Sequence, residues 1–82
     1  MKKWWIIDDR LTSRGQIFET MTNCATLEDV LCLARNEWKA LSSYDRKSCD
    51  DFFVCIADVG EDGCIDYPSI TETHPVTTKH HD

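Results

Sequence analysis

The sequence lacks the residue patterns on which most catalytic sites are built. It has five cysteines but no C-x-x-C pair, and its three glycines form no phosphate-binding loop. No Ser-His-Asp spacing occurs, and the one histidine outside the C-terminal tail, His74, is followed by a proline. Paired acids such as Asp8 and Asp9 would point to opposite faces of a strand. We therefore expect no enzymatic activity and no cofactor.

Ligand sets for metals are also missing. Residues 58–66 resemble the start of a calcium loop, but Gly60 takes the third ligand position and Ser69 the twelfth, where a bidentate glutamate is expected. The cysteines and histidines lack the short paired spacing of a structural zinc site. We expect a hairpin turn with solvated carboxylates, thiols that act as small core or surface groups, and no metal.

Long apolar runs are absent as well. The four apolar residues after Lys3 end at Asp8, short of a signal-peptide core, and nothing approaches the roughly 20 apolar residues of a membrane span. The odd number of cysteines argues against the disulfide framework of a small secreted domain. These observations predict a cytoplasmic protein with reduced thiols and no membrane partner.

Basic residues are nearly absent from the second half of the chain, where the net charge of -6 is concentrated. Residues 1–48 carry seven acids and eight bases, whereas residues 49–82 carry eight acids and one base, Lys79. Such a surface repels nucleic acid and favours basic partners. The candidate partner-binding residues, all acidic and all in this half, are Asp50, Asp51, Asp58, Glu61, Asp62, Asp66 and Glu72.

The chain length of 82 residues predicts a single domain over residues 1–76 with a polar tail at 77–82. A helix is expected from about Leu27 to Leu41, capped by Thr26 with Asp29 three residues later. Its apolar residues recur every three or four positions, so we expect one face to pack on a sheet. The stripe comprises Leu27, Leu31, Ala34, Trp38 and Leu41, widened by Val30.

Strand patterns flank this helix on both sides. Aromatic and β-branched residues fill both faces of the first segment, which predicts a strand that is buried on both sides or central in its sheet. A turn around Gly15 closes the first hairpin, and Pro68 interrupts the last strand. The fold class is therefore α+β, a ββαββ chain with a four-stranded, mostly antiparallel sheet and one amphipathic helix on one face. The expected strands are residues 3–10, 16–22, 52–59 and a broken segment from 64 to 76.

Several motifs extend over nearly all of residues 4–74. They include Asp8-Asp9-Arg10-Leu11-Thr12, Ile17-Phe18-Glu19-Thr20, Phe52-Phe53-Val54-Cys55 and Asp62-Gly63-Cys64-Ile65-Asp66-Tyr67. In these motifs the chain resembles small proteins encoded on phages and conjugative elements of Gram-positive gut bacteria. That group has no established activity, so the resemblance assigns no functional residue to this chain. The resemblance implies an anti-defence role in a bacterial host cell, such as an anti-CRISPR or anti-restriction inhibitor.

Two classes of function follow from these patterns. The first is a non-enzymatic inhibitor whose acidic C-terminal hairpin mimics phosphates and occupies a basic groove of a nucleic-acid-binding nuclease or effector complex. The second is a structural or regulatory module that assembles through a strand edge or a helix face, in which the acids only maintain solubility. A Cys/His metal-binding or redox protein is a third, weaker alternative.

Overall fold

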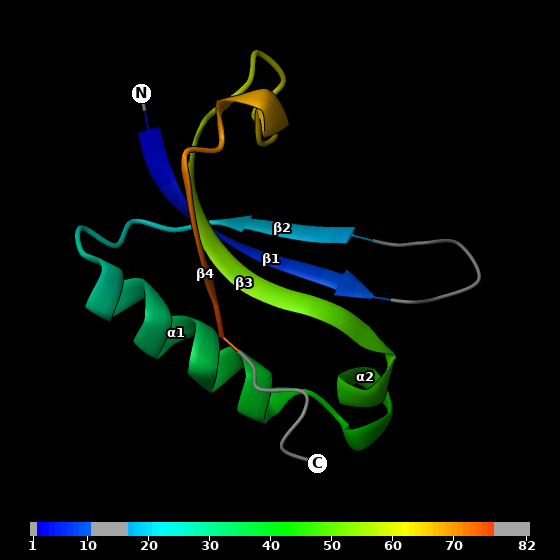
Figure 1. The fold of residues 1–82 in the computed structure, drawn as a ribbon. Helices are drawn as coiled ribbons and strands as arrows, with labels where there is room; N and C mark the ends of the chain where they lie inside the picture. The colour runs from blue at the N-terminus through cyan, green and yellow to red at the C-terminus, as the bar shows by residue number, and fades with distance from the viewer. Residues whose placement is uncertain (1, 11–16, 77–82) are drawn as a thin grey trace.

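In the computed structural model, which describes residues 2–10 and 17–76, one helix packs across an antiparallel four-stranded sheet (Figure 1). The strand order is β2-β1-β3-β4, so β2 and β4 form the two edges. The α+β fold class predicted from the sequence is confirmed. The elements are β1 (Lys2–Arg10), β2 (Ile17–Met21), α1 (Leu27–Ala40), α2 (Ser43–Ser48), β3 (Cys49–Asp58), the 3-10 turn η1 (Tyr67–Ser69) and β4 (Glu72–Pro75).

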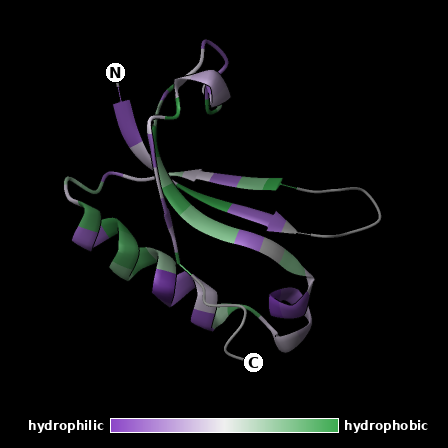
Figure 2. Cartoon of the chain, viewed as in Figure 1, coloured by the Kyte–Doolittle hydropathy of each residue, from purple (hydrophilic) through white to green (hydrophobic). Residues whose placement is uncertain are grey.

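The central strand β1 is buried on both faces, as its continuous apolar run predicts. Trp5, Ile6 and Ile7 are each 2% exposed, because β1 lies between β2 and β3 and its two faces carry separate core clusters. Hydropathy colours show the apolar residues concentrated in this part of the sheet and along one side of α1 (Figure 2). Asp8 and Asp9 lie on opposite faces, and only Asp8 is fully buried.

Helix α1 covers the face of the sheet that carries Ile6 and Val54. Its first turn is capped as expected, since the Thr26 hydroxyl accepts a hydrogen bond from the Asp29 N–H at 3.2 Å. The most deeply buried helix residues are Val30 and Ala34, both fully shielded from solvent. Leu31 and Trp38, which the sequence predicts to be buried, are only partly buried and pack at the margin of this core.

Helix α1 does not cover the opposite face of the sheet. Its core contains Trp5, Cys55 and Ala57, and the chain between β3 and β4 folds back over them with Ile65 and Ile70. The Trp5 indole N–H donates to the Ala57 carbonyl at 3.1 Å, which satisfies the one polar group of that side chain. This second core therefore depends on a loop as its cover.

The remaining elements differ from expectation mainly at their ends. The short helix α2 is capped by Ser42, whose hydroxyl accepts from the Asp45 N–H at 3.1 Å, and strand β3 begins at Cys49, three residues earlier than predicted. The last strand is β4 alone: residues 64–66 contribute only a Val59–Ile65 bridge, and Pro68 lies in η1. The expected turn around Gly15 and the tail at 77–82 lie outside the described residues. None of the helices in the described part of the chain is long and apolar enough to cross a membrane.

Candidate functional site: an acidic turn at one end of the sheet

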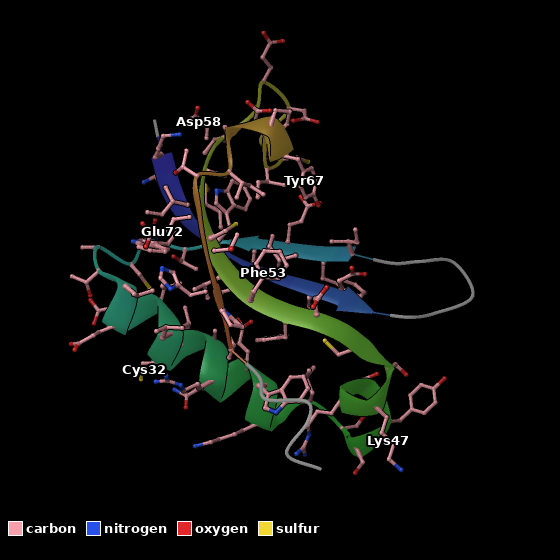
Figure 3. The ribbon with its side chains drawn as sticks, viewed as in Figure 1. Cys32, Lys47, Phe53, Asp58, Tyr67 and Glu72 are labelled. Carbon is pink, nitrogen blue, oxygen red and sulfur yellow. The ribbon has the colours of Figure 1, made fainter. Side chains whose placement is uncertain are left out.

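The last residue of β3 and the connection after it together hold four acidic residues on a compact projection at one end of the sheet, far from α2 (Figures 1 and 3). We call Asp58, Glu61, Asp62 and Asp66 the acidic turn. Glu61, Asp62 and Asp66 are exposed, and Asp58 is half-buried. The four residues border an open hollow of about 750 Å³, whose wall also includes Val59, Gly60 and Ile65.

Backbone hydrogen bonds fix the tip of this turn. The Gly60 N–H donates to the Cys64 carbonyl at 2.6 Å, and the Gly63 N–H donates to the Gly60 carbonyl at 3.0 Å. Gly63 has φ +83, a left-handed conformation in which a residue with a side chain is strained. The Asp62 Oδ1 accepts from the Cys64 N–H at 3.1 Å, so this carboxylate also shapes the turn.

The base of the turn is held by a serine. The Ser69 hydroxyl accepts from the Asp58 N–H at 2.7 Å and donates to the Asp66 carbonyl at 2.6 Å. A further backbone bond joins the Asp66 N–H to the Asp58 carbonyl at 3.0 Å. Beneath these groups Ile65 is 7% exposed and packs into the second core. The carboxylates therefore lie on an ordered support, which lowers the entropy cost of presenting them to a partner.

The local charge is negative but not uniform. The Lys2 ammonium lies 3.7 Å from the Asp58 Oδ1, so Asp58 contributes less to the field outside the protein than the three exposed acids. The Asp62 carboxylate acts on a neighbouring side chain. Its negative charge is the main cause that raises the pKa of the Cys64 thiol. Cys64 is thus a protonated thiol beside a carboxylate at neutral pH.

The structure divides the predicted binding residues into two groups. Glu72 begins β4 opposite Ile56, two residues before Asp58 along β3, and its Oε2 lies 2.5 Å from the Nε2 of His74. Glu72 therefore extends the acidic surface along the sheet edge. Asp51 lies seven residues from Asp58 on the same strand, about 23 Å away at the usual rise of a strand.

The far end of β3 has a different electrostatic character. Asp50 and Asp51 follow Cys49, the first residue after α2, and α2 carries Arg46 and Lys47 in its last turn. Figure 3 shows Lys47 at the end of the molecule opposite Asp58. Because Asp50 and Asp51 lie at the opposite end of β3 from Asp58, they do not extend the surface formed by the acidic turn and Glu72.

One acidic residue near the turn is absent from the sequence-based set. Glu19 is in β2, yet its Oε1 accepts a hydrogen bond from the Tyr67 hydroxyl across 48 positions of sequence. Burial, followed by this hydrogen bond, raises the pKa of Tyr67. The alternation of β2 places Glu19 on the face away from α1, but only the folding of η1 over that face brings Tyr67 to it.

The thiols and the calcium-like stretch show no sign of a metal site. None of the five cysteines forms a disulfide, and Cys49 and Cys55 are buried. Burial raises the pKa of Cys55 to about 11, as expected for a thiol in an apolar strand. Within residues 2–10 and 17–76, no group of three or more histidine, cysteine, aspartate or glutamate side chains is arranged to hold a metal ion.

Comparison of the chain with protein-family models, with curated proteins and with solved structures found no match.

Proposed function

We propose that this protein is a small non-enzymatic inhibitor that binds a basic groove of a nucleic-acid-handling enzyme through its acidic turn. The observation that carries the proposal is the display of Glu61, Asp62 and Asp66 as exposed carboxylates on a hydrogen-bonded turn. Carboxylates in such an array can form charge-assisted hydrogen bonds with the lysine and arginine side chains that otherwise hold phosphates. An anti-CRISPR or anti-restriction protein of a phage or other mobile element would act in this way, in the cytoplasm of the bacterial host.

Electrostatics gives the proposal a measurable signature. Exposed charges are screened over about 10 Å at 0.1 M salt, so binding by the acidic turn should weaken steeply as ionic strength rises. Charge complementarity acts mainly on the association rate, which falls when the charges are removed. Binding that depends on shape alone would show neither behaviour.

The alternative is a regulatory module that assembles through a strand edge, with the acids serving solubility. The outer edge of β2, with which none of the residues 2–10 and 17–76 pairs, is the specific observation in its favour, because unpaired backbone groups on an edge strand can accept another strand. The two functions use different surfaces and can be separated by mutation.

The test uses a variant that removes charge while keeping hydrogen-bond acceptors: Glu61→Gln, Asp62→Asn and Asp66→Asn together. The asparagine oxygen at position 62 can still accept from the Cys64 N–H. A matched control removes three exposed charges elsewhere, by Glu28→Gln, Asp29→Asn and Asp51→Asn. Both variants should fold, because exposed substitutions usually change stability by less than about 0.5 kcal/mol each.

The assay is inhibition of DNA cleavage by a panel of purified RNA-guided and restriction nucleases, at 50 and 300 mM salt. We expect the wild type and the control to inhibit at least one enzyme at low salt. The acidic-turn variant should need at least a tenfold higher concentration. Equal inhibition by both variants, or no inhibition of any enzyme, would refute the proposal.

A further inference from the structure

A second surface, independent of the acidic turn, lies along the outer edge of β2. In the ladder between β1 and β2, the Thr22 N–H donates to the Trp4 carbonyl at 2.9 Å. Antiparallel strands alternate between residues that bond to the neighbour and residues that face away from it. Counting back from Thr22, the backbone groups of Thr20 and Phe18 face β1, whereas those of Ile17, Glu19 and Met21 face outward.

No described residue pairs with this outer edge, since β2 is the first strand in the order β2-β1-β3-β4. Edge strands usually carry a lysine, a proline or a bulge that discourages further pairing. β2 has the sequence Ile-Phe-Glu-Thr-Met with none of these, and its three large apolar side chains are well exposed: Ile17 at 47%, Phe18 at 44% and Met21 at 45%. The other edge, β4, ends in Pro75.

A groove accompanies the edge on the side of the helix. It has a volume of about 300 Å³ and lies between β2 and the second half of α1, where Phe18 and Thr20 meet Glu37 and Asp8. The pairs Ile6–Thr20 and Asp8–Phe18 show that these two β2 side chains point to the helix face. A strand added beside β2 would direct alternate side chains into this groove.

We propose that β2 binds an extended segment of a partner protein by strand addition, with an arginine or lysine of that segment in the groove beside Glu37. The outward-facing backbone N–H and C=O groups of Ile17, Glu19 and Met21 form the hydrogen bonds to the partner segment. The groove determines which partner side chains are preferred. The Glu37 carboxylate in the groove lining favours a long cationic side chain, whose methylene stem can pack on Phe18. On the other face, Ile17 and Met21 favour apolar residues in the partner. The segment therefore alternates apolar and basic residues.

A second copy of the chain fits this edge poorly. In the antiparallel register that pairs all five residues of β2 with themselves, Glu19 lies opposite its own copy, and like charges in that position are destabilising. Each copy also carries a net charge of -6. A basic segment removes both conflicts.

The probe is a nine-residue peptide that alternates valine and arginine, with blocked termini and a fluorescent label. Two controls separate strand addition from general attraction of a cationic peptide to an acidic protein. One peptide has the same composition with the valines and arginines in separate blocks, and the other is N-methylated at alternate residues, so that it cannot donate along one edge. We expect both controls to bind at least tenfold more weakly than the probe in fluorescence anisotropy.

Protein variants locate the site. Glu37→Gln should weaken binding of the probe by threefold or more, whereas Glu28→Gln, an equal charge change on the exposed first turn of α1, should not. The acidic-turn variant should keep at least half of the affinity, which makes failure of this inference distinguishable from failure of the proposed function. In amide hydrogen exchange, the probe should slow exchange at Ile17, Glu19 and Met21.

The inference is overturned by any of three results: no binding at 1 mM peptide, equal binding of the N-methylated peptide, or protection confined to residues outside β2. Self-association of the protein through β2 in sedimentation, with β2 protected in the absence of peptide, would identify a second copy as the occupant and also overturn it.

Discussion

The helix face that the structure defines can be tested by replacing Val30 with alanine. Val30 has no exposed surface and packs with Ile6, Ala34 and Val54 between α1 and the sheet. The substitution removes two carbon atoms from this core, a transfer loss of about 1.6 kcal/mol, to which a cavity term adds up to about 1 kcal/mol. The higher helix propensity of alanine returns about 0.5 kcal/mol. The expected net loss in unfolding free energy is about 2 kcal/mol.

For a chain of this size, such a loss is a large part of the total stability. Domains of 82 residues typically unfold with about 4–12 kcal/mol. The midpoint of thermal unfolding should therefore fall by roughly 8–16 °C. The assay is a thermal melt followed by circular dichroism, supported by urea unfolding at constant temperature.

A matched control comes from the same helix. Leu33 is 41% exposed, so Leu33→Ala removes more carbon than Val30→Ala but from a site in contact with water. We expect it to cost less than about 1 kcal/mol. If Leu33→Ala destabilises the protein as much as Val30→Ala does, the assignment of the helix face that contacts the sheet is wrong.

Two further predictions concern the thiols and metals. Asp62→Asn should lower the pKa of Cys64 toward its usual value, because it removes the carboxylate that disfavours the thiolate; alkylation of Cys64 at pH 8 should then be several times faster, with exposed Cys32 as an unchanged internal reference. A rate for Cys64 that stays the same would contradict this account of the turn. A strong chelator should leave the thermal midpoint unchanged, and a drop of several degrees would show that a metal supports the fold.

Local patterns in the sequence determined most of the elements of this fold. The stripe from Leu27 to Leu41 and the cap at Thr26 predicted α1 to within one residue, because helix periodicity and capping depend on residues three or four positions apart. The apolar run in β1 predicted a central strand because only such a strand needs both faces apolar. The acidic character of the turn at residues 58–66 was equally visible, since it depends on composition alone.

The sequence did not predict correctly which residues of α1 are buried most deeply. Leu31 and Val30 both lie on the apolar side of the helix, and a stripe with steps of three and four residues favours Leu31. In the structure the helix is rotated so that Val30 and Ala34 face the centre of the sheet, and Leu31 lies at its margin. The rotation depends on how the side chains of two elements interlock, which no local pattern encodes.

Only the tertiary structure decided which charged residues share a surface. The sequence grouped Asp50 and Asp51 with the acids of the turn because they are close along the chain, but an extended strand separates them by the length of β3. No local pattern joins Glu19 to Tyr67, although the fold brings the two side chains into hydrogen-bond contact. The strand order that places β2 at an edge of the described sheet is likewise set by non-local pairing. Composition and periodicity act over a few residues, whereas a binding surface is formed by segments that meet only when the chain folds.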